Sequence, residues 1–368
     1  TVIILVLALG TGSYWYFHDP TRVWDVLASV LIVACPCALA LALPFGLGHG
    51  MRIMGRKGVY LKNAAVIEQL ANVRQLVFDK TGTLTRNHPE SIRFVGVKLD
   101  ALSNSMIKTI CSNSAHPLSK LIAKHFGDSV IKLPIDHFYE EVGKGVEAKM
   151  NGTCVRIGSA KWVGVEGAED QSESKVYVSI DDHYQGFFSI KSGYRTGIFE
   201  SLKQLRRSFK LHLLSGDNAS ERAQLAPYFD QFHFHQKPLD KYQYVEGLYS
   251  NTLMIGDGLN DAGALKRAQV GFAVCEDIHQ FSPACNGLIE ANSVVRVGRV
   301  LRFSKSVIAI VIAAFIISFA YNVVGLSFAI TGNLKPVVSA ILMPLSSVSV
   351  VGFITLMVSL LGRIQFKE

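Results

Sequence analysis

The sequence predicts α-helical membrane segments at both ends of the chain and an α/β body between them, with a smaller α+β domain inserted into that body. Apolar residues concentrate in residues 1–50 and 303–362, where they form candidate membrane spans. Between these ends, four short apolar runs have the character of buried parallel strands: 76–79, 211–215, 252–256 and 270–274. Residues 87–190 do not fit this sheet, and we interpret them as the inserted domain.

The composition argues against a nucleic-acid-binding protein and against a disulfide-rich one. The 368 residues carry a formal net charge of +8, but no basic block with interleaved aromatic residues is present. We attribute the excess of Lys and Arg to cytoplasmic loops that face anionic membrane lipid, and we expect no nucleic acid partner. Six scattered cysteines are too few for a disulfide framework.

Two apolar segments open the chain. Residues 1–17 contain no charge but are short for a span, which needs about 20 residues. The second segment runs from Val23 to about Gly50, and the basic residues after it place its exit on the cytoplasmic side by the positive-inside rule. Because the chain begins within an apolar run and without an initiator Met, we expect the native protein to continue upstream of Thr1.

Two further apolar segments close the chain, at about 303–330 and 336–362. Basic residues flank both outer ends of this pair, so these ends are cytoplasmic as well. The predicted topology is a membrane hairpin at residues 1–50, a second at 303–368, and a cytoplasmic body between them.

The body divides into a sheet domain, made of residues 51–86 and 191–302, and the insertion. Three of the predicted strands end in a carboxylate-bearing turn, at Asp79, Asp217 and Asp257, and ligands bind at that edge of an open α/β sheet. The predicted crossover helices are 195–208, 220–227 and 261–268. In the insertion we expect a strand at 92–98, helices at 103–112 and 117–126, and short strands at 146–151, 154–158, 175–180 and 184–190.

The first predicted strand leads directly into seven residues of unusual chemistry: Asp79, Lys80, Thr81, Gly82, Thr83, Leu84 and Thr85. An Asp in this position can attack a phosphoryl group and form an aspartyl-phosphate. The hydroxyls and Gly82 leave backbone N–H groups free to surround an oxyanion, and Lys80 adds positive charge. A solvated strand-to-helix turn is the simpler alternative, but it does not account for the whole string.

This string resembles the phosphorylation motif of P-type ATPases, the ion pumps that cycle through an aspartyl-phosphate. Two further elements resemble the same family: Ser215, Gly216, Asp217 and Asn218 match its Thr-Gly-Asp element, and Lys241 matches the lysine that neutralises the transferring phosphate. The resemblance implies a Rossmann-like phosphorylation domain of the haloacid dehalogenase type, with ATP and Mg²⁺ as cofactors. No Gly-x-x-x-x-Gly-Lys-Ser/Thr string is present, which argues against a P-loop NTPase.

The turn after the third predicted strand carries two carboxylates four residues apart, Asp257 and Asp261. Mg²⁺ takes hard oxygen ligands, commonly one or two carboxylates together with phosphate oxygens. A calcium loop is the alternative, but the later ligand positions of such a loop are apolar or basic here. The family resemblance supports Asp257 as the Mg²⁺ ligand, with Asn260 and Asp261 completing the site.

The inserted domain carries two short elements that resemble the nucleotide pocket of heavy-metal pumps. His116 stands before Pro117 as in their His-Pro element, and Glu140, Gly143 and Gly145 match their Glu-x-x-Gly-x-Gly element. Each element alone is weak, because a Gly-Lys-Gly turn is common and a His before Pro is often structural. Their combination after Asp79 implies that this domain binds the adenine nucleotide.

Cys35 and Cys37 flank Pro36 in the middle of the second apolar segment. Proline removes a helix hydrogen bond and kinks the helix, which directs both thiols toward one point. Two cysteines packed at a kink are the structural alternative, whereas paired thiolates would bind a soft metal. The Cys-Pro-Cys arrangement resembles the heavy-metal (P1B) branch of P-type ATPases.

The closing segments narrow the predicted metal to Cu(I). Residues 307–362 contain no Asp, Glu or His, which a Zn²⁺ or Cd²⁺ site with two thiolates would ordinarily include. The polar residues present match the Tyr-Asn and Met-x-x-Ser-Ser elements of copper(I) pumps: Tyr321, Asn322, Met343, Ser346 and Ser347. Packing between membrane helices is an equally good explanation for Ser346. The resemblance implies ATP-driven Cu(I) export by a multi-pass protein of the bacterial inner membrane, with a copper chaperone as a partner.

The sequence also departs from the family pattern. Ser192, Gly263 and Gln269 replace residues that are usual in the family, and no Thr-Gly-Glu actuator sequence is present. We therefore expect an actuator domain and amino-terminal spans outside this chain, which we interpret as the carboxyl-terminal part of a pump. A Zn²⁺/Cd²⁺ pump, a membrane-attached phosphatase of the haloacid dehalogenase type and a metal sensor without turnover are the alternatives.

Overall fold

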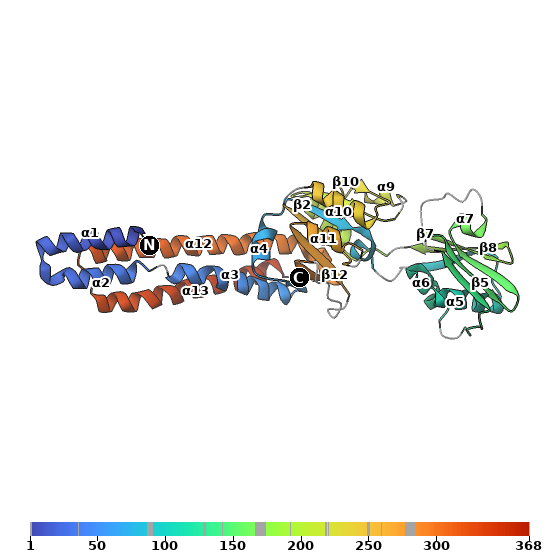
Figure 1. Ribbon diagram of the computed structural model, residues 1–368, viewed down its shortest axis with the longest axis horizontal. Helices are drawn as coiled ribbons and strands as arrows, with labels where there is room; N and C mark the ends of the chain where they lie inside the picture. Colours follow the sequence, from blue (N-terminus) through green and yellow to red (C-terminus); the bar gives the residue numbers. More distant parts are fainter. Residues whose placement is uncertain are drawn as a thin grey trace. The chain divides into compact units, whose positions relative to one another are not determined.

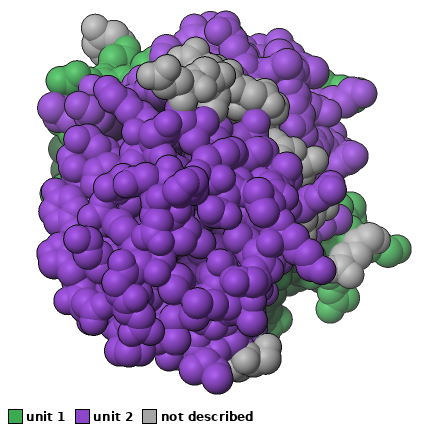
Figure 2. Space-filling view, turned by 90° about the vertical axis from the view of Figure 1, so that its right-hand side faces the viewer, with its two compact units in different colours: residues 1–77, 207–209, 242–368 green, residues 78–206, 210–241 purple. Residues whose placement is uncertain are grey.

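In the computed structural model the chain forms two compact units, which Figure 2 shows in different colours. One unit contains residues 1–77, 207–209 and 242–368, and the other contains residues 78–206 and 210–241. The structure describes residues 2–35, 37–86, 91–127, 130–141, 143–165, 174–191, 193–217, 219, 221–248, 251–258, 260–276 and 285–367.

The apolar ends of the chain form long helices that pack alongside one another (Figure 1). Within the described residues, three helical stretches are long and apolar enough to cross a membrane: Pro20–Gly55, Ala291–Ile330 and Pro336–Gln365. The first segment forms a helix of 17 residues, which is short for a span, as the sequence indicates. The helices are α1 (Val2–His18), α2 (Val23–Val33), α3 (Cys37–Gly55), α12 (Val297–Ile330) and α13 (Pro336–Gln365).

Glycines allow these helices to approach one another closely. A Cβ atom at Gly46 of α3 would lie 2.5 Å from Val311 of α12, and one at Gly325 of α12 would lie 2.9 Å from Val33 of α2. The predicted interruption at the Cys-Pro-Cys sequence is confirmed, because α2 ends at Val33 and α3 begins at Cys37. Pro36 itself lies outside the described residues.

A seven-stranded sheet has the order β1-β13-β12-β11-β2-β9-β10. Its members are β1 (Val59–Leu61), β2 (Gln75–Asp79), β9 (Lys210–Leu214), β10 (Gln231–His233), β11 (Thr252–Gly256), β12 (Val270–Cys275) and β13 (Gly287–Glu290). The four predicted strands are confirmed, and they are consecutive in this order as β12, β11, β2 and β9. The pairs β9–β10, β11–β12 and β12–β13 are parallel, and β1 pairs antiparallel with β13.

The helices of the α/β body are short. The predicted crossovers correspond to α8 (Ile198–Arg206), α9 (Arg222–Leu225) and α11 (Ala262–Arg267). Two further helices, α4 (Ala65–Ala71) and α10 (Pro238–Gly247), were not predicted from the sequence. Helix α10 is relevant to the site because it carries Lys241.

The inserted domain is an antiparallel sheet of six strands, in the order β3-β8-β7-β6-β5-β4. The strands are β3 (Ser91–Gly96), β4 (His137–Glu141), β5 (Gly145–Met150), β6 (Thr153–Gly158), β7 (Ser174–Ile180) and β8 (His183–Lys191). They confirm all five predicted strands of this domain, and β4 is additional. The helices are α5 (Ala101–Asn113), α6 (Pro117–His125) and the short α7 (Ala160–Val163).

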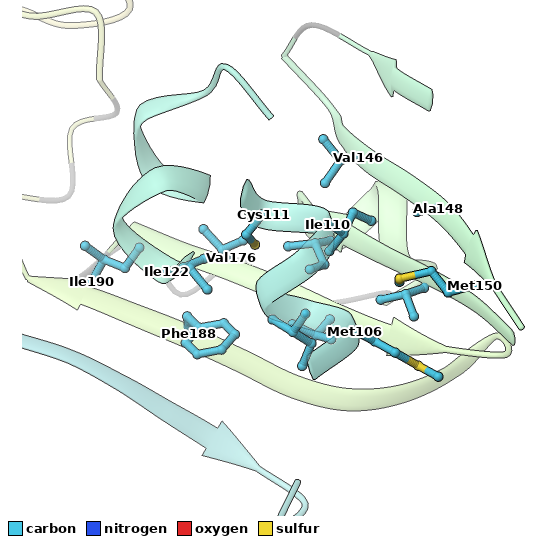
Figure 3. Close-up of a cluster of buried hydrophobic side chains, with 14 residues drawn as sticks. Met106, Ile110, Cys111, Ile122, Val146, Ala148, Met150, Val176, Phe188 and Ile190 are labelled. Carbon is cyan, nitrogen blue, oxygen red and sulfur yellow. The ribbon is translucent and has the colours of Figure 1, made fainter. Parts of the chain in front are cut away.

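Buried apolar side chains join these helices to the sheet (Figure 3). Met106, Ile110 and Cys111 of α5 lie within one cluster with Val146 of β5 and Phe188 of β8. Burial of such side chains stabilises each by about 1.5–3 kcal/mol relative to exposure. The insertion therefore has a hydrophobic core of its own.

Candidate active site

Asp79 is the last residue of strand β2, which is buried in the sheet. Its residues Leu76, Val77 and Phe78 are fully buried, and the carboxylate of Asp79 follows them at 4% exposure. The Nζ atom of Lys241, from α10, lies 2.6 Å from Oδ1 of Asp79. The structure therefore brings together two residues that the sequence proposed for phosphoryl transfer and that lie 162 positions apart.

The residues after Asp79 form a tight turn, η2 (Lys80–Leu84). Gly82 has φ of +73°, a conformation that glycine adopts without steric cost. The guanidinium of Arg195 fixes this turn, because its Nε donates to the carbonyl of Thr83 and its Nη2 to that of Gly82, both at 2.7 Å. Arg195 is buried, and the sequence analysis did not predict it as a member of the site.

The ammonium of Lys80 is directed toward two carboxylates. It lies 2.8 Å from Asp217 and 3.0 Å from Glu221, and the hydroxyl of Tyr194 donates to the same Glu221 oxygen at 2.9 Å. The sequence predicted that Lys80 would add charge for an oxyanion; in the structure its charge is balanced by these acids. Glu221 and Tyr194 were missed, because they are ordinary residues that only the fold brings to Lys80.

These contacts shift the pKa values of Lys80 and Asp217. Burial lowers the pKa of Lys80, but Asp217 and Glu221 together raise it above its usual value. Burial raises the pKa of Asp217, but Lys80 and the Thr81 hydroxyl, which donates to it at 2.8 Å, bring it below its usual value. Both groups are therefore charged at neutral pH.

Two buried hydroxyl groups belong to the turns that carry Lys80 and Asp217. Ser215, at the end of β9, is fully buried, and its Oγ accepts a hydrogen bond from the backbone N–H of Asp217 at 3.1 Å. The Oγ1 atom of Thr83 is also buried, but no group among the described residues forms a hydrogen bond with it. Buried hydroxyls are normally satisfied, so Thr83 is available for a bound ligand.

The Asp257 turn follows β11. The backbone N–H and the side-chain amide of Asn260 donate to the Asp257 carboxylate at 3.3 and 3.4 Å. A Cβ atom at Gly256 would lie 2.5 Å from an Asp261 carboxylate oxygen, so glycine is what allows this carboxylate to fold against the backbone. The oxygen donors fit Mg²⁺, which needs only one or two protein carboxylates. Over the described residues, no group of three or more His, Cys, Asp or Glu could hold a metal by itself.

A cavity of about 660 Å³ lies in the inserted domain, and all four predicted nucleotide residues line it: His116, Glu140, Gly143 and Gly145. Its volume is within the range of about 300–1,000 Å³ that is typical of ligand pockets. The structure thus places the His-Pro and Glu-x-x-Gly-x-Gly elements at one cavity, although each element by itself is weak evidence for nucleotide binding. Val142, which lies between Glu140 and Gly143, is outside the described residues.

Local contacts explain how these four residues are held. Nδ1 of His116 accepts a hydrogen bond from the backbone N–H of Leu118 and caps α6, and Glu140 accepts one from the Ser114 hydroxyl at 2.7 Å. At Gly145, a Cβ atom would lie 2.4 Å from the carbonyl oxygen of Ile157, so β5 and β6 require glycine there. Gly143 has φ of +80°.

The predicted copper residues lie on the long apolar helices, except for Cys35, which lies in the turn between α2 and α3. These helices contact one another. The sulfur atoms of Cys35 and Cys37 are joined as a disulfide between α2 and α3, so this pair must be reduced before it can act as two thiolates. On α12, Tyr321 donates to the carbonyl of Leu342 at 3.2 Å, and Asn322 is half-buried. On α13, the Ser346 and Ser347 hydroxyls donate to the carbonyl of Met343.

Comparison with known proteins identifies the family of the catalytic body. The family model of haloacid dehalogenase-like hydrolases matches residues 73–269. The chain belongs to this family. The matched range includes Asp79, the whole inserted domain, Lys241 and the Asp257 turn.

Relatives of this hydrolase are P-type ATPases. The chain is 28% identical to a copper-exporting P-type ATPase of Staphylococcus haemolyticus, with 95% of this chain and 46% of that protein covered. It is 29% identical to a silver-exporting P-type ATPase of Salmonella typhimurium, with 95% and 46% covered. The chain thus spans about half the length of the curated relatives it matches.

The fold of this hydrolase resembles that of a solved zinc-transporting PIB-type ATPase. The TM-score is 0.75 at 22% identity, with 97% of this chain and 62% of that chain covered.

Some departures from the family pattern can be located in the structure. A Cβ atom at Gly263 would lie 3.8 Å from the ring of Tyr242. Ser192 and Asn218 lie outside the described residues.

Proposed function

We propose that the chain transfers the γ-phosphoryl group of ATP to Asp79, as the energy-supplying step of a pump that exports Cu(I). A carboxylate oxygen of Asp79 attacks the γ-phosphorus, and the bond between that phosphorus and the bridging oxygen breaks. ADP leaves with the bonding electron pair, and Asp79 holds an acyl phosphate.

The observation that carries this proposal is the buried pair of Asp79 and Lys241 beside a turn with an unsatisfied hydroxyl. Lys241 is placed to neutralise phosphate charge next to the attacking oxygen, at 2.6 Å from it. Thr83 offers its hydroxyl to a phosphate oxygen, and Arg195 holds the turn that positions it. Positioning and charge stabilisation are the main contributions a protein makes to phosphoryl transfer.

Further residues support the same reaction. The Lys80–Asp217–Glu221 cluster fixes the side chains on either side of the turn. Asp257, Asn260 and Asp261 would hold Mg²⁺, which offsets phosphate charge when bound. The cavity lined by His116 and Glu140 is large enough for the adenosine part of ATP.

The choice of Cu(I) as the transported ion rests on ligand chemistry. Cys35, Cys37 and Met343 offer two thiols and a thioether, the ligands that soft monovalent ions prefer. The relatives named as copper and silver exporters agree with a soft monovalent ion. The likeness to the zinc-transporting protein concerns the fold.

The test is the metal dependence of Asp79 phosphorylation in the 368-residue chain, reduced and reconstituted in lipid vesicles. We expect Cu(I) and Ag(I) to increase labelling from ATP and Zn²⁺ to have no effect. Cys35→Ser and Cys37→Ser should each reduce Cu(I) stimulation by at least about tenfold, because loss of weaker, indirect metal contacts already costs about 10–100-fold.

Cys154→Ser is the matched control, since Cys154 is a half-buried cysteine of the inserted domain and should leave the stimulation unchanged. Stimulation by Zn²⁺ and not by Cu(I) would show that the transported ion is divalent and that the assignment to Cu(I) is wrong. Full Cu(I) stimulation in both membrane variants would remove Cys35 and Cys37 from the transport site.

A further inference from the structure

A basic cavity lies between α3 and α13, at the ends of these helices that the sequence assigns to the cytoplasm. Its volume is about 580 Å³. Four cationic side chains line it, two from the turn after α3, one from the last turn of α13 and one that follows α13: Arg56, Lys57, Arg363 and Lys367. We refer to these four residues as the basic cluster.

The basic cluster has no anionic partner in the described part of the chain. No acidic residue lines the cavity, and none of the four side chains forms an ion pair with a described carboxylate. Like charges at close range repel one another unless an anion lies between them. Arg and Lys around a hollow are typical of a phosphate-binding site.

The two helices meet directly beneath the basic cluster. A Cβ atom at Gly362 of α13 would lie 3.0 Å from the Ile53 side chain of α3, so this glycine allows close contact. Deeper in the pair, Nε2 of His49 lies 2.8 Å from Oγ of Ser359. These contacts hold the cations of both helices around one opening.

A second cavity continues along the same helices toward the middle of the membrane segment. It has a volume of about 430 Å³ and shares His49 with the first cavity. Besides His49, its lining contains Arg52 and Thr355, which are polar, and Pro44, Phe45 and Gly48, which are apolar and lie farther from the cytoplasmic end of α3. A side chain at Gly48 would meet nothing within 4 Å. A basic cavity at the membrane surface, followed by one whose far end is apolar, fits an amphiphile better than a free ion.

We propose that this pair of cavities binds one anionic phospholipid. The headgroup phosphate contacts the basic cluster, and an acyl chain lies along Pro44, Phe45 and Gly48. Basic pockets between membrane helices on the cytoplasmic side are suited to anionic headgroups. The inference depends on the membrane placement of α3 and α13, and it is independent of phosphoryl transfer to Asp79.

The test is native mass spectrometry of the 368-residue chain in detergent micelles, with phosphatidylglycerol added to obtain a dissociation constant. We expect the double variant Arg363→Gln/Lys367→Gln to bind about thirtyfold more weakly, given the contribution of each basic residue near an anionic headgroup. The matched control is Arg302→Gln/Lys305→Gln. It removes the same two residue types from the cytoplasmic end of α12 and leaves the cavity intact. An equal loss in both double variants would show only diffuse attraction to anionic lipid and would overturn the proposal.

A second pair of variants tests the apolar end of the second cavity without changing charge. Gly48→Leu should fill it and weaken binding of long-chain phosphatidylglycerol, but not of a dihexanoyl analogue. Gly10→Leu is its control, because Gly10 is a helical glycine of α1 whose Cβ also meets nothing within 4 Å. If inorganic phosphate displaces the lipid as well as the lipid displaces itself, the cavity is a site for free phosphate and the lipid assignment is wrong.

Discussion

At the scale of single residues, the two lysines near Asp79 contact different carboxylates. Lys241 contacts Asp79, whereas Lys80, the next residue in the chain, contacts Asp217 and Glu221. Removing one member of a buried ion pair leaves the other charge uncompensated and is strongly destabilising. The two lysines therefore have different expected roles, although a sequence motif alone would treat both as phosphate-binding.

The first prediction concerns Arg195, which holds two carbonyls of the turn after Asp79. Arg195→Lys keeps the positive charge but removes the planar guanidinium that donates to both carbonyls, so at least one buried carbonyl loses its hydrogen-bond donor. We expect a loss of about 1–3 kcal/mol in the free energy of unfolding, measured by thermal unfolding in detergent. Arg86→Lys is the control: Arg86 is exposed and contacts Thr196, so its replacement should cost under about 0.5 kcal/mol. Equal effects of the two variants would contradict the role given to Arg195.

The second prediction concerns pH. The folded-state pKa of Asp217 lies below its usual value, so its contribution to stability is fully present above the unfolded pKa, about 4. This contribution is lost as the pH falls through the lower, folded pKa. Asp217→Asn should therefore be less stable than the wild type at pH 7, and the difference in unfolding midpoint should narrow below about pH 4.

The control for the pH series is Glu200→Gln, because Glu200 is an exposed residue of α8. Its unfolding midpoint should follow that of the wild type at every pH. A difference between Asp217→Asn and the wild type that stays constant down to pH 3 would show that Asp217 does not titrate as the ion pair requires.

At the scale of secondary-structure elements, burial and length decide what the sequence reveals. Strands β2, β11 and β12 are runs of five or six residues that are almost wholly buried, and these were predicted correctly. Strands β1 and β10 have three residues each, too few for a periodic pattern to be recognised. Their pairing with β13 and β9, and not local preference, makes them strands.

The candidate site could likewise be predicted only in part from the sequence. Asp79 and the Asp257 turn stand at the ends of recognisable strands, so their approximate place in the sheet follows from the sequence. Arg195 and Glu221 could not be predicted, because they act through contacts with residues more than a hundred positions away. Nothing in their immediate sequence separates them from solvated charges.

The third prediction concerns strands β5 and β6. Gly145→Ala places a Cβ atom 2.4 Å from the Ile157 carbonyl oxygen, so the strands must separate beside the nucleotide cavity. We expect a loss of about 1–3 kcal/mol in stability and weaker ATP binding, followed by the fluorescence of Trp162, which contacts Gly145. Gly247→Ala, at the end of α10 and with open space around it, is the control. Normal ATP affinity in Gly145→Ala would place the nucleotide elsewhere.

At the scale of the whole molecule, the chain combines a hydrolase-family body with helices long enough to cross a membrane. The apolar ends and the sheet were recognisable because each is a long or repeated pattern. The identity of the transported ion is a finer property, because it depends on a few side chains on separate helices. The phosphorylation of Asp79 is the step on which the account of the body depends.

The measurement that tests this step most directly is labelling of the 368-residue chain with ATP that carries ³²P in the γ position. The account predicts acid-stable, hydroxylamine-sensitive label in the wild type and in Asp182→Asn, a control at an exposed carboxylate. Asp79→Asn should show the same Trp162 fluorescence change on ATP binding as the wild type, but it should carry no label, because its neutral amide cannot attack phosphorus. Label that persists in Asp79→Asn at the wild-type level would contradict the account, because the phosphate acceptor would then be a different residue.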